Sequence, residues 1–193
     1  MSVSQPGSAI ERLPLLRGLP PAARGAIGAC AVERLFRAGD RLLSGGERAE
    51  WLYILERGLV REFYVSARGE EHTRVFVCEG GVTGSLLDLR SGGHSLTWIE
   101  ALEPTRAFAI RFDAFNDLAA RSPDIERLAR RHVELLAIAK TLREYEMLAL
   151  PASERLARWR QTHPHLEGRI TRRLLASYLG VTPVHLSRIW PRA

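Results

Sequence analysis

The residues with the clearest chemical potential lie near the C-terminal end of the chain, within residues 170–189. Leu186 and Ile189 would give a short helix there an apolar side. The opposite side would expose residues suited to contact with DNA: Thr182, Val184, His185, Ser187 and Arg188. An arginine on such a face can bind guanine O6 and N7 with two hydrogen bonds, and a valine can contact the methyl group of thymine. Arg188 is therefore the predicted base reader, and Val184 a predicted thymine contact.

Two short helices joined by a tight turn must position these side chains. Leu175 and Leu179 lie four residues apart on the first helix, and Gly180 permits the turn that follows. Thr182 can cap the second helix through its hydroxyl, and Pro183 suits the first turn of that helix. This order predicts a helix-turn-helix, whose second helix enters the major groove of duplex DNA.

Positive charge is concentrated in the same part of the chain. Residues 1–120 carry 14 Arg against 15 Asp and Glu, a net charge of −1, whereas residues 149–193 carry 8 Arg against 2 Glu, a net charge of +6. Such a concentration favours duplex binding, because cations that neutralise phosphates release condensed counterions. Five polar residues are predicted to contact phosphates and so position the second helix: Arg169, Thr171, Arg172, Arg173 and Ser187.

The bulk composition excludes several other classes of protein. The 193 residues are 46% apolar, which suffices for a folded core, and no apolar run reaches the ~18 residues of a membrane span. Residues 1–8 lack the features of a secretory signal, so we expect a cytoplasmic protein without a membrane segment. Cys30 and Cys78 have no His or Cys at the spacing of metal ligands. We therefore expect both cysteines to pack as buried small apolar residues, and we expect no metal or cofactor. No acid/base pair, activated nucleophile or phosphate loop is recognisable, so the sequence does not indicate an enzyme.

The segment that precedes the basic region has the pattern of a β-protein. Residues 36–112 alternate short apolar runs with glycine-containing turns, which predicts an antiparallel, jelly-roll-like β-roll. Helical patterns lie before it, at residues 13–30, and after it, at residues 113–120. The predicted roll domain therefore occupies residues 1–120.

A long helix is predicted over residues 121–149, with Ser122 as its cap and Pro123 in its first turn. One side of it has the alternating spacing of three and four residues that is typical of a coiled-coil seam: Ile125, Leu128, His132, Leu135, Ala139 and Leu142. This spacing favours a parallel homodimer, which would supply two DNA half-sites. The alternative is a helix that packs on its own β domain, and both uses can coexist on different faces.

The third predicted domain, residues 150–193, begins with a hinge at residues 150–153. A helix follows at residues 153–161, with Leu156 and Trp159 buried. Glu167 and Gly168 would then turn a small hairpin, the wing of a winged helix-turn-helix. The predicted fold class is α+β, with an N-terminal antiparallel β-roll, a long dimerisation helix and a C-terminal winged helix-turn-helix.

This order of parts resembles the Crp/Fnr family of bacterial transcription regulators, over nearly the whole chain. The segments that carry the resemblance lie at residues 36–42, 52–60, 99–105, 153–156, 175–182 and 186–189. The resemblance implies a homodimeric transcription regulator that binds double-stranded DNA, with RNA polymerase as a further partner. The alternative function is a β-roll that binds a small ligand or cyclic nucleotide, with a basic tail that recognises no specific DNA.

The resemblance also implies where an effector would bind. Members that bind cyclic nucleotides have a Gly-Glu and, about ten residues later, an Arg-Ser or Arg-Thr, because Glu binds the ribose hydroxyl and Arg neutralises the phosphate. Ser85 stands where that Glu is expected and Ser95 where that Arg is expected. We therefore expect no cyclic AMP binding in the usual manner, and the effector stays unidentified. Another ligand would use Gly84, Ser85, Leu86, Leu87, His94, Ser95 and Thr97, unless these residues simply fill the roll.

Overall fold

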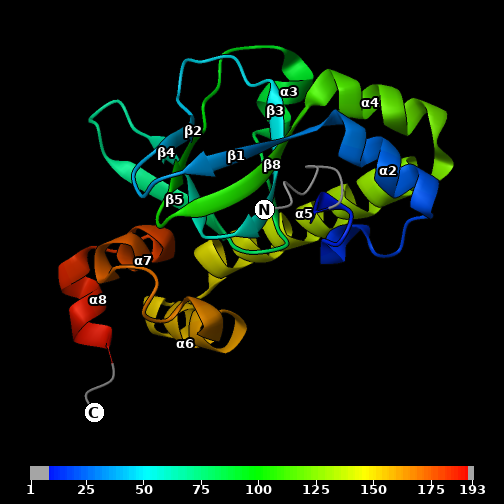
Figure 1. Cartoon of the computed structure of the whole chain (residues 1–193). Coiled ribbons are helices and arrows are strands. Elements are labelled where there is room, and N and C mark those ends of the chain that lie inside the picture. The colour runs from blue at the N-terminus through cyan, green and yellow to red at the C-terminus, as the bar shows by residue number, and fades with distance from the viewer. Residues whose placement is uncertain (1–8, 191–193) are drawn as a thin grey trace.

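The computed structural model describes residues 9–190 of the chain (Figure 1). Its elements follow in this order: η1 (Pro14–Leu16), α2 (Pro21–Cys30), β1 (Ala31–Phe36), β2 (Arg41–Leu43), β3 (Trp51–Arg57), β4 (Val60–Val65), β5 (Glu71–Val77), β6 (Val82–Thr83), α3 (Leu86–Ser91), β7 (Trp98–Ala101), β8 (Thr105–Arg111), α4 (Phe112–Arg121), α5 (Pro123–Ala149), α6 (Ala152–Thr162), η2 (Pro164–Leu166), α7 (Arg172–Leu179) and α8 (Pro183–Ile189).

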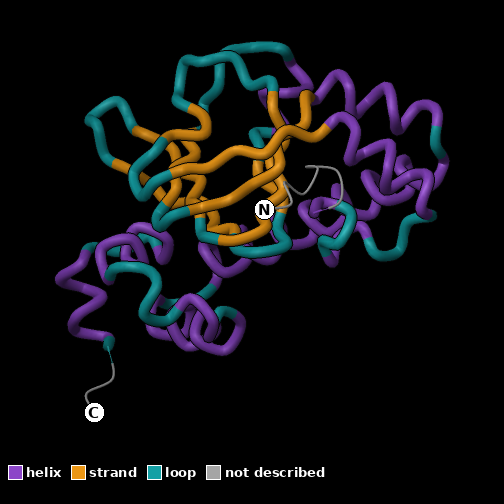
Figure 2. Tube along the Cα trace, in the orientation of Figure 1, coloured by secondary structure: helices purple, strands orange, loops and turns teal. Residues whose placement is uncertain are grey.

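The strands form two four-stranded sheets, in the orders β1-β8-β3-β6 and β2-β7-β4-β5. All the pairings between these strands are antiparallel, which confirms the predicted β-roll. Figure 2 shows the strands gathered into one body, with helices around it. The short strand β6 pairs with β3 through Thr83 and Tyr53, and this pairing places the segment from Gly84 onward beside the roll.

Strand β8 shows how the sequence builds the core on both sides of a sheet. Four consecutive residues of β8, from Ala107 to Ile110, are almost completely buried, because β8 lies between β1 and β3. Phe108 and Ile110 pack with Ile27 of α2 and with the helices outside the sheet. Ala107 and Ala109 alternate with them and pack inside the roll.

Helix α5 has the predicted start and length. The Ser122 hydroxyl accepts a hydrogen bond from the Ile125 amide at 3.4 Å, and the 27 residues of the helix span about 40 Å. The predicted seam is wrong at its first position, because Ile125 is completely buried in the core of its own roll domain. Leu128 is partly buried against the same core. The later apolar residues of α5 have no such cover, as Leu135 shows with 60% exposure.

The C-terminal module consists of α6, η2, α7 and α8, with Leu156 and Trp159 in its core as predicted. The predicted break near Pro151 is present, since α5 ends at Ala149 and α6 begins at Ala152. The predicted wing is wrong, because the segment between α6 and α7 contains η2 and turns instead of a hairpin. Pro164 begins η2, and Leu166 is buried in the module core at 1% exposure, which draws this segment onto the helices.

Among residues 9–190, we find no helix with the length and apolar character needed to span a bilayer.

Candidate nucleic-acid interface

Threonine hydroxyls cap both helices of the predicted motif, and Thr182 is the cap that the sequence predicted. The Thr171 hydroxyl accepts from the Leu174 amide at 3.3 Å, and the Thr182 hydroxyl accepts from the His185 amide at 3.1 Å. Gly180 ends α7 in the left-handed conformation, with φ of 67°. A side chain at Gly180 would be strained there, and its Cβ would lie 2.5 Å from Cε of Met147. The turn therefore depends on glycine both for its backbone and for its contact with α5.

Helix α8 turns one face inward and presents the other to solvent. Leu186 is 1% exposed and packs in the module core, whereas Val184 is 62% exposed. The residues predicted to contact DNA from this helix and its cap are all exposed: Thr182, Val184, His185, Ser187 and Arg188. One face of one helix thus carries the arginine and the small side chains that base recognition needs.

A second group of exposed cations lies at the start of α7. Arg172 and Arg173 are exposed, as is Thr171. Trp190 packs against the module, and the guanidinium groups of Arg172 and Arg160 lie 4.6 and 4.2 Å from the centroid of its ring. Within residues 9–190, we find Arg172, Arg173 and Arg188 in no ion pair, so their charges are available to an anion.

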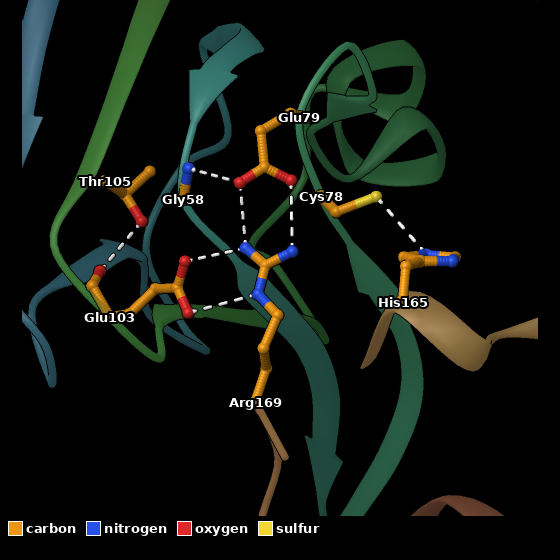
Figure 3. A network of polar contacts seen from close by, with 7 residues as sticks. All are labelled: Gly58, Cys78, Glu79, Glu103, Thr105, His165 and Arg169. Atoms are coloured by element: carbon orange, nitrogen blue, oxygen red, sulfur yellow. Dashed lines mark hydrogen bonds and ion pairs between the residues drawn. The ribbon is translucent and has the colours of Figure 1, made fainter. Parts of the chain in front are cut away.

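Arg169 is placed differently from the other predicted phosphate contacts. Its guanidinium turns toward the roll and binds the carboxylates of Glu79 and Glu103 (Figure 3). The Arg169 Nη2 atom lies 2.8 Å from Glu79 Oε1 and 2.6 Å from Glu103 Oε1, while Nη1 and Nε complete a bidentate pair with each carboxylate. The prediction that Arg169 contacts phosphate is contradicted in this arrangement, because two carboxylates of the same chain already neutralise it.

The electrostatics of this cluster agree with its geometry. Burial alone would raise the pKa of Glu79, but hydrogen bonds from Arg169, from its own backbone and from Gly58 prevail and lower the pKa to about 2. Hydrogen bonds to Glu103 and Glu79 raise the pKa of Arg169. Glu79 and Arg169 are therefore both charged across the physiological range of pH.

Further contacts join α7 to the roll. The amide of Thr73 in β5 donates to the Ser177 hydroxyl at 2.8 Å, and that hydroxyl donates to the Glu71 carbonyl at 2.8 Å. The rings of Phe76 and Tyr178 lie 5.5 Å apart, and Phe76 belongs to the buried cluster that forms the core of the module. The sequence did not indicate these contacts, because Ser177 looks like an ordinary helix residue and its partners lie about a hundred residues earlier in the chain.

The two cysteines are half-buried rather than fully buried. The Cys78 thiol lies 3.7 Å from Nε2 of His165, across the same junction between roll and module. Burial raises the pKa of the Cys78 thiol, and the charge of Glu79 raises it further. A raised pKa lowers the fraction of thiolate that Cys78 forms at neutral pH.

The predicted effector pocket is a closed polar cluster around a residue that the sequence analysis missed. Asp88, on α3, is 3% exposed, as are Ser85, Ser95 and Thr97. The hydroxyls of Ser85 and Ser95 donate to the Asp88 carboxylate, the second at 2.7 Å, and the Ser85 and Thr97 hydroxyl oxygens lie 3.1 Å apart. The available signal was an aspartate between leucines in a short helix.

Two of the predicted pocket residues lie outside this cluster. Leu87 is 67% exposed, because the turn of α3 directs it to solvent. His94 is exposed, and its Nδ1 lies 2.7 Å from the Gly46 carbonyl. The expectation that these two residues line the pocket is therefore wrong, whereas Ser85, Ser95 and Thr97 do lie together. Gly84 and Leu86 flank the cluster in sequence and are half-buried.

The interior of the roll contains a second charged group that was not predicted. Glu62, with its side chain 5% exposed, pairs with Arg74 and accepts from the Thr83 hydroxyl at 2.8 Å. Burial raises the pKa of Glu62, and the Arg74 charge and the hydrogen bonds offset this effect only in part. A separate cavity of about 320 Å³ contains none of the predicted pocket residues and is lined by Leu42, Leu43, Glu47, Arg48, Ala49, Glu50, Trp51, Tyr53 and Ile99.

These residues do not fit a cyclic nucleotide bound in the usual manner. A cyclic phosphate requires a cation within residues 84–97, which we call the cassette, but the ionisable side chain buried there is that of Asp88. Arg74 is already paired with Glu62. Arg90 is exposed and lies over the ring of Phe112, 5.1 Å from its centroid. Ser85 and Ser95 stand where the usual Glu and Arg are expected, and both bind Asp88 instead of offering a carboxylate and a cation to a ligand.

The structure thus joins a β-roll to a long helix and a helix-turn-helix. Residues 33–122 match the family model of the cyclic nucleotide-binding domain. The fumarate and nitrate reduction regulatory protein of Escherichia coli (strain K12) is 25% identical over 171 residues, covering 83% of this chain and 65% of that protein. The chain thus spans slightly less than two thirds of the length of this curated relative.

Solved structures share the fold. FixK2 from Bradyrhizobium japonicum aligns with a TM-score of 0.69 at 22% identity, covering 82% of each chain. A structure from Eubacterium rectale assigned to the Crp/Fnr family of transcriptional regulators aligns with a TM-score of 0.73 at 17% identity, covering 91% of this chain and 84% of that one. These likenesses, together with the match to the family model, make the chain similar to Crp/Fnr regulators, and the solved structures show that it shares their fold.

Proposed function

We propose that this protein is a transcription regulator of the Crp/Fnr type that binds double-stranded DNA as a homodimer in the cytoplasm. The observation that carries the proposal is the exposed face of α8 with Arg188 and Val184, together with Arg172 and Arg173 of α7, which are exposed and form no ion pair within residues 9–190. Such a surface combines base readers with phosphate anchors. The regulatory relatives support the same role, and we propose RNA polymerase as a further partner.

The exposed apolar side of α5 supports the homodimer. Leu135 and Leu142 of the predicted seam are 60% and 55% exposed, although they lie along one helix of a folded protein. A second copy of α5 would bury them in a seam of the coiled-coil kind, with Ala139 as a small residue within it. His132 lies in the half-buried part of α5, where burial lowers its pKa, and it fits the seam as a neutral packing residue.

The mechanism that we propose is a shift of population between two dimer arrangements. Only one arrangement would separate the two α8 helices by about 34 Å, one turn of the duplex. The roll would bias this equilibrium through α5 and through the joint near Pro151. Cyclic AMP is not the proposed effector, because the cassette holds Asp88, Ser85 and Ser95 where the ligand would need a cation.

Selection from randomised duplexes tests the proposal. The wild-type protein should enrich a two-fold symmetric site, and Arg188→Ala should lose preference at one position in each half-site, a loss of about 1–3 kcal/mol in discrimination. Arg173→Ala is the matched control, since loss of a phosphate contact should weaken binding to all sequences alike. If no site is enriched at any salt concentration, the chain is instead a β-roll with a basic tail.

A further inference from the structure

We propose that Arg169 is a positioning residue that sets the direction of α7 and α8 from the roll, and that it does this without contacting DNA. The inference rests on the proposed function, because the positioned element is the proposed DNA reader. It concerns the clamp, by which we mean Arg169 with Glu79 and Glu103 (Figure 3).

The clamp uses the hydrogen-bonding capacity of Arg169 almost completely. A guanidinium has five N–H donors, and Nε, Nη1 and Nη2 of Arg169 make four bonds to the two carboxylates. One positive charge between Glu79 and Glu103 leaves the cluster with a net charge of −1. A phosphate approaching Arg169 would therefore meet net repulsion, and it would have to displace bidentate partners.

Both carboxylates lie in turns of the roll, Glu79 between β5 and β6 and Glu103 between β7 and β8. The position of Arg169 therefore depends on the position of these turns. Glu79 lies in the turn between β5 and β6, where the Gly80 amide donates to the Leu55 carbonyl at 2.8 Å. The Gly58 amide donates to the Glu79 carboxylate at 3.0 Å. Strand β6 follows this turn and leads directly into Ser85 of the cassette. A displacement of the cassette would move Glu79 and, through it, Arg169.

On the module side, the clamp acts at the start of the helix that supports the reader. Arg169 precedes the cap Thr171 by two residues, and Ser177 fixes the other end of α7 to β5 through Thr73. Contacts with the roll near both ends of α7 fix the direction of the helix axis. Helix α8 packs on α7 through Leu186 and Leu175 in the same core, so its direction is defined as well.

Three full-length variants separate positioning from phosphate contact: Arg169→Gln, the pair Glu79→Gln with Glu103→Gln, and Arg173→Gln. If Arg169 positions the reader, the first two break the same clamp and should act alike. Both should weaken binding to the best wild-type site by at least about fivefold, and both should accept a wider range of half-site spacings. Both should keep the wild-type slope of log affinity against log salt. Arg173→Gln, the control, should reduce that slope by about 0.9 per subunit.

A phosphate-contacting Arg169 would give the opposite pattern. Arg169→Gln would then reduce the salt slope, and removal of the Glu79 and Glu103 charges would free Arg169 and raise the affinity for DNA. Either result overturns the inference. The variant with both Glu79→Gln and Glu103→Gln changes only turns of the roll. If Arg169→Gln fails to fold, the affinity and salt slope of this double variant still distinguish positioning from phosphate contact.

A measurement without DNA distinguishes failure of this inference from failure of the proposed function. Hydrogen exchange at the Thr73 amide reports docking, because this amide donates to Ser177 across the junction. Both clamp variants should lose protection at Thr73, and Arg173→Gln should not. If the clamp variants lose protection at Thr73 but the wild-type protein selects no DNA site, the clamp holds the module to the roll and the proposed regulatory function is refuted. Unchanged protection in both clamp variants would refute the clamp.

Discussion

The ion pair between Glu62 and Arg74 permits a quantitative test of how the roll interior is filled. Arg74→Met would keep much of the side-chain volume and would leave the Glu62 carboxylate, which is 5% exposed, without its charged partner. Breaking a fully buried pair in this way costs about 3–5 kcal/mol. The Arg74 side chain is 37% exposed, so solvent screens the pair, and we take about 2 kcal/mol. For a chain of this size, that loss lowers Tm by about 4–8 °C.

Thermal unfolding followed by circular dichroism at pH 7 would measure this loss. Arg68→Met is the matched control, because Arg68 is exposed in a turn of the same hairpin, and its Tm should change little. Glu62→Gln in the Arg74→Met background should recover most of the loss, since a neutral amide still accepts the hydrogen bond from Thr83. The pair of variants thus separates a charge effect from a packing effect.

The dependence on pH gives a second check. Burial raises the pKa of Glu62 above its ordinary value of 4.5 in the folded protein, and removal of Arg74 would raise it further. A raised carboxyl pKa destabilises the fold at high pH, and the penalty disappears as the pH falls through the folded pKa. The gap in Tm between Arg74→Met and wild type should therefore shrink on acidification. A Tm within about 1 °C of wild type at pH 7, with no such trend, would refute the reasoning.

Three further predictions concern the sensor, the dimer and the module. Cyclic AMP should leave the Tm of the wild-type protein unchanged, because Asp88 lies where the phosphate needs a cation; an upward shift would show a competent site. Leu142→Glu should yield monomers in light scattering, whereas Glu144→Gln, also exposed on α5, should stay dimeric. Burial, and then the charge of His165, lower the pKa of His163, so the fold loses stability as the pH falls below 6.5. His163→Asn should lose less Tm than wild type between pH 7.5 and 5.5, and an equal loss would count against this reading.

The helix-turn-helix was predictable because its determinants are local. Thr171, Thr182 and Gly180 act on backbone groups within a few residues, and Leu186 reveals the buried side of α8 through helical spacing. The β-roll was predictable for a similar reason, since glycine turns and alternation define each strand by itself. These features depend on the nearest few residues and hardly on the tertiary neighbours.

The errors share the opposite cause. The spacing that placed Ile125 in a dimer seam also suits a contact with the helix's own domain, and only the fold decides between the two. Arg169 was assigned to DNA from its charge and neighbours, but its partners Glu79 and Glu103 are 90 and 66 residues away in the sequence. The prediction of a wing hairpin was wrong because Leu166 is buried in the module core, which holds this segment against the helices. Which residues pair across such sequence distances depends on how the chain packs in three dimensions, and the pattern of residues along the sequence does not show this packing.

The contacts of the module limit how it can move. Rotation about Pro151 would have to break the two ion pairs of Arg169, worth about 1 kcal/mol each at this exposure, and expose Phe76, worth about 2 kcal/mol. These two contributions favour the docked arrangement by about 4 kcal/mol, a ratio of about a thousand, and the hydrogen bonds of Ser177 add to it. An effector that prefers the undocked arrangement by less than this ratio would leave the reader where the roll holds it. The control of α8 thus lies as much in the clamp as in the hinge.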